Sequence, residues 1–218
     1  MRRFAVIGLG RFGAHLAARL YELGHEVLAV DADPAVVQSV HGKVSTAAIV
    51  DARDKQQLRA LGLKDFDTVI ISVGDHLEAS TLAALYCKEM ELQVVARAVN
   101  EDHGRILDAL GVDEVVFPEH DMAIRLAERL SSGNLLDYIP LGEDYSIMEL
   151  AVPDSFAHKT LAELNVRARF NVHVLAIQDV LTGKVLMAPA ADQVLEDTNV
   201  LVVLGQRKDL DRFQKIAR

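Results

Sequence analysis

The sequence predicts an α/β protein in which a Rossmann-like, doubly wound parallel sheet is followed by a small α+β C-terminal domain. Three observations predict this fold. A glycine-rich turn joins an apolar strand to a helix at the start of the chain. Apolar strands then alternate with helical stretches as far as residue 118, after which hairpin-like strands and short helices follow. The 218 residues are enough for one full domain and a smaller one.

The first strand and helix flank the motif GLGRFG, residues 8–13. Gly8 allows a tight turn, Gly10 leaves room for a phosphate to approach the backbone, and Gly13 lets the helix pack closely on the strand. Unpaired amide groups and the positive end of the helix attract an anion. The motif therefore predicts a nucleotide site, and the alternative is a purely structural turn.

Two charged residues refine this prediction. Asp31 ends the second strand, where its carboxylate can accept hydrogen bonds from ribose hydroxyls and would repel a 2′-phosphate, so NAD or adenosine nucleotides are favoured over NADP. Arg11 lies inside the motif, where its guanidinium can reach a terminal phosphate. The motif thus favours a polyphosphate ligand, and the alternative for Arg11 is a solvated side chain on the first helical turn.

Six mainly apolar segments are predicted to form a parallel sheet covered on both faces; they lie at residues 4–7, 27–30, 44–49, 68–73, 94–98 and 114–117. Asp33 precedes Pro34, which predicts a helix cap with proline in the first turn. Asp51 or Asp54 is expected to open the next helix.

The pattern changes after Pro118. A helix is predicted over residues 119–133, ending at the breaker SSGN (residues 131–134), so we expect an N-terminal domain at 1–134 and a C-terminal domain at 135–218. The second domain is predicted to contain strands at 145–152, 171–180, 183–188 and 199–205, and helices at 158–165 and 210–216.

Composition excludes several classes of function. The net charge of -9 and the lack of a basic run argue against a nucleic-acid-binding surface. The single cysteine, Cys87, cannot form an internal disulfide or a cysteine metal site, so we expect a core residue in a reducing compartment. No signal peptide is recognised, and the apolar runs are far shorter than the roughly 20 residues of a membrane helix. We expect a cytoplasmic protein that reaches a membrane only through a partner.

An enzyme is not the first expectation. A nicotinamide dehydrogenase needs a substrate domain with an acid or base beside the hydride-transfer centre, whereas the second domain is small and its His158 and His173 belong to no recognisable catalytic constellation. His173 alternates with apolar residues, which predicts a strand-face histidine. A small NAD-dependent oxidoreductase and an NADH-binding redox sensor remain as alternatives.

Several segments together resemble a known family: FAVIGLGRFG, EVLAVD, AIVDARD, LEASTLAALYCKEM, FPEHDMAIRLAERL and LNVRARF. They are similar to the KtrA/TrkA family, the cytoplasmic RCK regulators of bacterial potassium transporters, and the similarity covers essentially the whole chain. The single-unit length and the GRFG motif resemble the KtrA type more than the tandem TrkA type. The resemblance implies an RCK N-terminal domain, an RCK C-terminal domain and a regulatory role.

The resemblance also implies a site for ATP or ADP formed by Gly8, Gly10, Arg11, Phe12, Gly13, Asp31, Asp51, Ala52, Gly74 and Arg97. In such a site Asp31 binds the ribose, Asp51 and Ala52 lie beside the adenine, and Arg97 approaches the phosphates. The alternatives are that Asp51 is only a helix cap and that Arg97 is a solvated strand end.

Further partners follow from the same resemblance. Glu119 resembles a glutamate near the dimer interface that helps to bind a divalent cation, magnesium or calcium, and its alternative role is a first-turn carboxylate. Val166, Arg167, Asn171 and Pro189 match positions that contact cyclic di-AMP in some relatives, and the alternative is a strand-to-strand corner at an interface. The family forms dimers that close into an octameric ring under a membrane potassium-translocating subunit of the KtrB/TrkH type.

Overall fold

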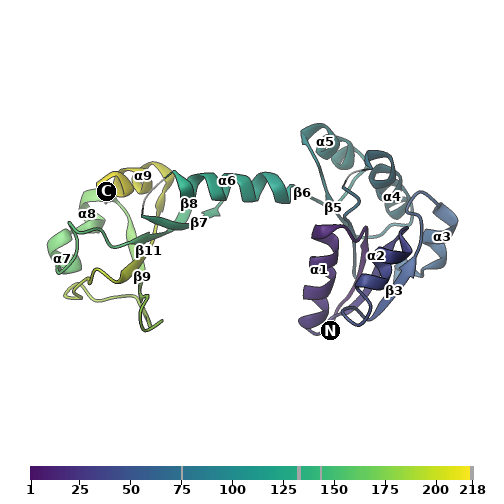
Figure 1. Cartoon of the computed structure of the whole chain (residues 1–218). Helices are drawn as coiled ribbons and strands as arrows, with labels where there is room; N and C mark the ends of the chain where they lie inside the picture. The colour runs from purple at the N-terminus through teal and green to yellow at the C-terminus, as the bar shows by residue number, and fades with distance from the viewer. Residues whose placement is uncertain (75, 132–133, 143, 217–218) are drawn as a thin grey trace. The chain divides into compact units, whose positions relative to one another are not determined.

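The computed structural model describes residues 1–74, 76–131, 134–142 and 144–216. The chain forms two compact units, Met1–Pro118 and Glu119–Arg218, each with its own sheet (Figure 1). The boundary between the units falls after Pro118, the first residue of helix α6 (Pro118–Leu130), so nearly all of α6 belongs to the second unit. The domain boundary predicted after residue 134 lies beyond the end of that helix. Ser132 and Gly133 of the predicted breaker lie outside the described residues.

The first unit contains a six-stranded, wholly parallel sheet in the order β3-β2-β1-β4-β5-β6. Its strands are β1 (Arg3–Ile7), β2 (Glu26–Asp31), β3 (Thr46–Ile49), β4 (Thr68–Ile71), β5 (Val94–Arg97) and β6 (Glu114–Val116). All six predicted strands are confirmed. The order reverses between β1 and β4, and in such sheets ligands bind at the carboxyl ends of the strands where this reversal occurs.

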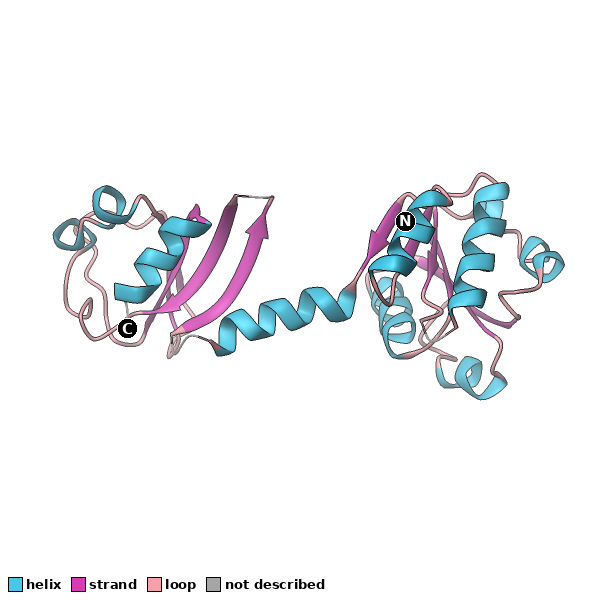
Figure 2. Ribbon diagram, turned by 90° about the horizontal axis from the view of Figure 1, so that it is seen from above, coloured by secondary structure: helices cyan, strands magenta, loops and turns pink. Residues whose placement is uncertain are grey.

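Helices cover both faces of this sheet (Figure 2). One face packs against α1 (Arg11–Glu22) and α2 (Pro34–Ser39). The other packs against α3 (Lys55–Ala60), the 3-10 turn η1 (Leu63–Asp65), α4 (Leu77–Glu89) and α5 (Glu101–Ala109). Cys87 of α4 is fully buried in this second layer, as predicted for a core cysteine.

Side-chain caps define where several of these helices begin. Asp33 accepts a hydrogen bond from the backbone N–H of Ala35 at 2.8 Å, which confirms the predicted cap of α2. Asp54 accepts from Gln56 and Gln57 at the start of α3. Asp54 is therefore the cap of α3, and the interpretation of Asp51 as that cap is wrong.

The second unit contains a five-stranded antiparallel sheet in the order β10-β9-β11-β8-β7. Its strands are β7 (Leu135–Leu141), β8 (Tyr145–Ala151), β9 (His173–Asp179), β10 (Val185–Met187) and β11 (Asn199–Gln206), and its remaining helices are α7 (Leu161–Leu164), α8 (Val166–Phe170) and α9 (Arg207–Ile216). Aromatic rings of Phe156, Phe170 and Phe213 pack in its core, with centroids 5.3 and 5.7 Å apart. His173 is exposed in β9, which confirms the strand-face prediction.

Two elements of this unit were not predicted. β7 contains Pro140, which cannot donate to a strand ladder, but β7 is an edge strand, where proline is tolerated. The segment of residues 166–170 forms helix α8, so its interpretation as a strand-to-strand corner is wrong. Asn165, with φ 46°, separates α7 from α8. Among the described residues, no helix has both the length and the apolar character needed to cross a bilayer.

Candidate nucleotide site

The glycine loop lies at the carboxyl end of β1 and leads directly into α1. Gly8 has φ 93° and donates its N–H to Val30 O at 2.8 Å. A Cβ on Gly8 would lie 2.7 Å from Val73 N, and a Cβ on Gly13 would lie 1.9 Å from Gly8 O, so neither position has room for a side chain. A Cβ on Gly10 would meet no atom within 4 Å among the described residues. The surface above Gly10 is therefore open to a ligand.

The N-terminus of α1 is electrostatically suited to an anion. Within the described part of the chain, no side chain caps this end, and its first turn contains no acidic residue. The unpaired amide groups and the helix dipole therefore give this end a partial positive charge that nothing in the helix offsets. Arg11 is exposed at the first helical position and adds a full charge. Phe12 follows it and is half-buried.

Asp31 ends β2 beside this loop. Its Oδ2 accepts the backbone N–H of Leu9 at 2.7 Å, and its Oδ1 accepts the N–H of Asp33 at 2.9 Å. An ionised carboxylate has about four lone-pair positions, so acceptor capacity remains for a hydroxyl group. The structure thus brings the predicted ribose-binding carboxylate into direct contact with the glycine loop.

The loop after β3 adjoins the end of β2, since Val50 donates its N–H to Asp31 O at 2.9 Å. Asp51 pairs with Arg53, whose Nη2 lies 2.7 Å from Oδ2 and whose backbone N–H donates to Oδ1 at 2.9 Å. These bonds from Arg53 lower the pKa of Asp51 to about 2 and keep its carboxylate ionised. Ala52 is buried beside it. Arg53 was not among the predicted site residues, and its spacing of two residues from Asp51 is the signal in the sequence that could have indicated it.

Gly74 and Arg97 meet at the same edge of the sheet. β4 and β5 are neighbouring parallel strands in which Ile71 pairs with Ala96. A Cβ on Gly74 would lie 2.1 Å from Nη1 of Arg97, so the guanidinium lies directly over Gly74. Because the preceding Val73 packs against Gly8, Arg97 is brought to the edge that holds the glycine loop.

Glu119 is exposed in the first turn of α6, next to an exposed pair in which His120 Nδ1 lies 3.3 Å from Asp121 Oδ1. A cluster of three histidine, cysteine or acidic residues suited to a metal does not occur in the described part of the chain. A cation at Glu119 would therefore need further ligands, such as phosphate oxygens and water. Its role stays a prediction.

The predicted cyclic di-AMP residues lie in different environments of the second unit. Val166 is buried in the core, so its side chain is not available to a ligand, whereas Arg167 is exposed in α8. Asn171, with φ 58°, donates its Nδ2 to Asp209 Oδ2 at 2.9 Å. Pro189 is half-buried just after β10. Binding of this dinucleotide stays a prediction.

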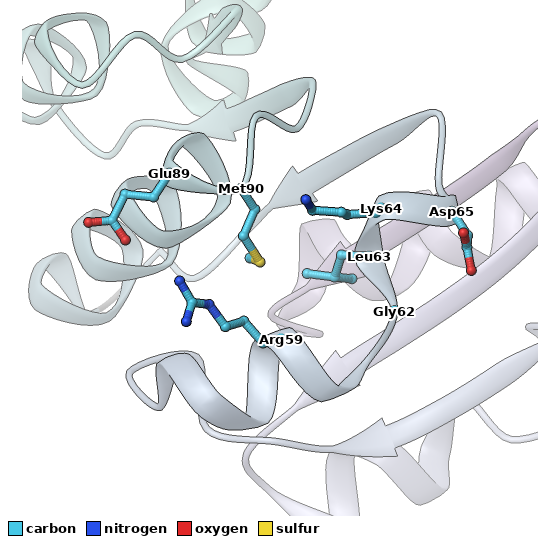
Figure 3. A pocket seen from close by; sticks show the side chains of 7 residues that line it. All are labelled: Arg59, Gly62, Leu63, Lys64, Asp65, Glu89 and Met90. Atoms are coloured by element: carbon cyan, nitrogen blue, oxygen red, sulfur yellow. The ribbon is translucent and has the colours of Figure 1, made fainter.

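A separate pocket of about 390 Å³ lies on the first unit, as Figure 3 shows. Its lining combines positive, negative and apolar side chains: Arg59, Gly62, Leu63, Lys64, Asp65, Glu89 and Met90. The turn η1 precedes β4, so the pocket lies near the amino ends of the strands. The glycine loop is at their carboxyl ends, and the pocket is therefore not the candidate nucleotide site.

Two family models match the chain. Residues 4–118 match the TrkA-N domain, and residues 147–218 match the TrkA-C domain. The chain is 37% identical to Ktr system potassium uptake protein A of Bacillus subtilis (strain 168), over 98% of this chain and 96% of that protein. It is 38% identical to Ktr system potassium uptake protein C of the same organism, with the same two coverages.

Solved structures share the fold. The GsuK RCK domain superposes with a TM-score of 0.69 at 18% identity, over 99% of this chain and 47% of that chain. The GsuK channel bound to NAD gives a TM-score of 0.66 at 18% identity, over 100% of this chain and 39% of that chain. This chain thus spans less than half the length of these structural neighbours.

Proposed function

Because the chain belongs to the KtrA-like family of RCK regulatory subunits, with TrkA-N and TrkA-C domains, we propose that it senses adenine nucleotides and gates a membrane potassium transporter. ATP and ADP bind where the glycine loop, Asp31 and the guanidinium of Arg97 meet. The observation that carries the proposal is the N-terminus of α1, which no described side chain caps and which lies at the open surface of Gly10.

The charges around the loop favour a chain of phosphates. The backbone of residues 8–13 cradles the first phosphates, and Asp31 accepts hydrogen bonds from the ribose. Arg11 and Arg97 supply two guanidinium groups, and guanidinium binds phosphate oxygens through paired, charge-assisted hydrogen bonds. Asp51 and Ala52 lie beside the adenine. The pKa of Asp51, lowered by Arg53, keeps this carboxylate an acceptor for the adenine amino group.

NAD(H) is the second candidate ligand. The GsuK channel bound to NAD has this fold, and a dinucleotide uses the same glycine loop and the same ribose-binding carboxylate. A dinucleotide has no terminal phosphate, however, so it gives no role to a charge at Arg11. This difference separates the two candidates experimentally. We propose a regulator in either case, and not an oxidoreductase.

Gating requires that the ligands favour different states of an assembly. We propose a homodimer that builds an octameric ring against a membrane subunit of the KtrB/TrkH type, at the inner face of the membrane. Moving a two-state equilibrium from 1:99 to 99:1 requires about 5.5 kcal/mol. Shared among eight sites, this is about 0.7 kcal/mol per site, or roughly a threefold difference in affinity. A modest difference in affinity that arises at one phosphate of the ligand is therefore sufficient to switch the assembly between its two states.

Two accessory ligands complete the proposal. A magnesium or calcium ion at Glu119 is completed by phosphate oxygens and water when ATP is bound. Cyclic di-AMP binds the C-terminal domain through the backbone at Val166, the side chains of Arg167 and Asn171, and Pro189. Both roles come from the family resemblance and need direct binding measurements.

The test is a titration of the full-length protein with ATP, ADP, NAD and NADH, followed by thermal unfolding and calorimetry. We expect ATP and ADP to stabilise the protein by an amount that rises with the logarithm of the ratio of ligand concentration to Kd, and Arg11→Ala to weaken ATP binding more than ADP binding. Arg19→Ala is the matched control, since Arg19 lies on the same helix and pairs with Glu22. Stabilisation by NADH alone would overturn the ATP assignment, and an equal loss for ATP and ADP would remove Arg11 from discrimination.

A further inference from the structure

Gly74 contacts the whole head group of Arg97. A Cβ on Gly74 would lie 2.1 Å from Nη1, 2.7 Å from Cζ and 3.1 Å from Nη2 of Arg97. All three distances are shorter than an ordinary van der Waals contact. The guanidinium therefore occupies the volume in which any other residue at position 74 would place its side chain.

The backbone conformation does not explain this glycine. Among the described residues, Gly8 and six other glycines have positive φ angles, but Gly74 is not one of them. Gly74 is therefore not required by a positive φ angle. The space taken by Arg97 is therefore the physical reason for a glycine at this position.

The contact also shows where the charge of Arg97 lies. β5 is two strands away from β1 in the sheet, which is about 10 Å at the usual strand spacing. Because the guanidinium lies over Gly74, Arg97 of β5 reaches the segment that follows the neighbouring strand β4. The segment before Gly74 already contacts that loop, since Val73 packs against Gly8 and Ser72 packs against Gly13.

We propose that Gly74 is a positioning residue, which seats the guanidinium of Arg97 beside the glycine loop so that it binds the outermost phosphate of ATP. This inference rests on the proposed function and deepens it, because it assigns triphosphate discrimination to a pair of residues. A guanidinium over the end of β4 can bind a third phosphate that extends past α1. A diphosphate ends closer to the loop and depends less on this charge.

The experiment is a double-mutant cycle on the full-length chain, with Gly74→Ala, Arg97→Ala and the double variant. The atoms displaced by a new Cβ are the far end of a flexible side chain, so we expect Gly74→Ala to fold and to melt close to the wild type without nucleotide. ATP affinity, measured by calorimetry, is expected to fall about tenfold, and ADP affinity by less than threefold. In the Arg97→Ala background the same substitution is expected to change neither affinity.

Arg97→Lys supplies a second variant that leaves Gly74 unchanged. It keeps the charge but loses the planar fork, so we expect a preferential loss of ATP affinity here too. An equal loss of ATP and ADP in Gly74→Ala, or a loss that persists in the Arg97→Ala background, would overturn the positioning role while wild-type binding still supports the proposed function. A wild-type protein that binds neither nucleotide would overturn both.

Discussion

The backbone N–H of Leu9 donates a hydrogen bond of 2.7 Å to Oδ2 of Asp31, and this bond joins the glycine loop to the end of the neighbouring strand. The other carboxylate oxygen, Oδ1, accepts the N–H of Asp33 at 2.9 Å. The residue expected to bind a ribose therefore also holds the loop expected to bind the phosphates. Both consequences can be measured separately.

Asp31→Asn tests this double role. An asparagine side chain offers a single acceptor oxygen, so either the N–H of Leu9 or that of Asp33 loses its partner, at a cost of about 1–3 kcal/mol. We expect the free energy of unfolding to fall by about 1–2 kcal/mol. Because the ribose also loses a charged acceptor, we expect ATP affinity to fall about tenfold or more. Urea denaturation and calorimetry measure the two effects.

Asp33→Asn is the matched control for this substitution. Asn caps helices about as well as Asp, so α2 should keep its cap. We expect unfolding free energy and nucleotide affinity to stay close to those of the wild type. An unchanged stability of Asp31→Asn would show that the bond to Leu9 contributes little.

The glycine loop offers a pair of substitutions that separates folding from binding. Gly13→Ala places a Cβ 1.9 Å from Gly8 O, and the overpacked loop is expected to lower the free energy of unfolding by about 3 kcal/mol or more. The Cβ of Gly10→Ala would meet no described atom within 4 Å, and the φ of -58° at this position suits alanine. We expect this variant to be about as stable as the wild type, because the lower entropy of its unfolded chain offsets the weaker preference for alanine at the N-cap of α1.

Binding should show the opposite pattern for Gly10→Ala. The new methyl group occupies the surface on which a phosphate approaches the backbone, so we expect ATP affinity to fall at least about tenfold. Thermal unfolding without nucleotide measures the stability of Gly13→Ala and Gly10→Ala, and an ATP titration measures their affinity. Wild-type ATP affinity in Gly10→Ala would mean that no phosphate contacts the loop at this position.

Most of the first unit could be predicted from the sequence because its signals are local. A mainly apolar run of four to six residues indicates each strand, and Asp33 followed by Pro34 indicates the start of α2. The need for glycine at position 13 could also be predicted locally, because the atom that leaves no room for a side chain there is the backbone oxygen of Gly8, five positions away. Predictions of this kind need no knowledge of which strands become neighbours.

The features that were missed depend on contacts between distant segments. β7 was not predicted, and its Pro140 is tolerated because pairing between distant segments places β7 at a sheet edge. Asn171 is paired with Asp209, 38 residues away, and the seat of Arg97 on Gly74 exists only because β4 and β5 are neighbours. No spacing in the sequence reveals such pairs.

His103 on α5 leads to a prediction about pH. Its side chain is fully buried, and its Nδ1 accepts the N–H of Val99 at 3.3 Å. In the neutral ring Nε2 then carries the proton, and it has no hydrogen-bond partner among the described residues. Burial lowers the pKa of His103, because the charged ring would lose its hydration.

The lowered pKa of His103 determines whether stability rises or falls with pH. Between the lowered pKa of the folded state and the value of about 6.5 in the unfolded chain, the unfolded state binds more protons. Above about pH 6.5 the ring is neutral in both states and the free energy of unfolding is not reduced by His103. Below about pH 6.5 the unfolded state gains a proton that the folded state does not, so the free energy of unfolding falls as the pH falls. We expect the midpoint of urea denaturation of the wild type to be lower at pH 5.5 than at pH 7.5.

His103→Asn is expected to flatten this dependence, because the amide oxygen can still accept from Val99 but cannot titrate in this range. The variant should be less stable at pH 7.5, since a smaller side chain leaves a cavity, so the comparison is the change in midpoint between the two pH values. His173→Asn, at an exposed position of β9, controls for the loss of a histidine. Equal pH dependence in the wild type and His103→Asn would assign the acid sensitivity to other groups and would show that the buried ring of His103 does not titrate between the two states.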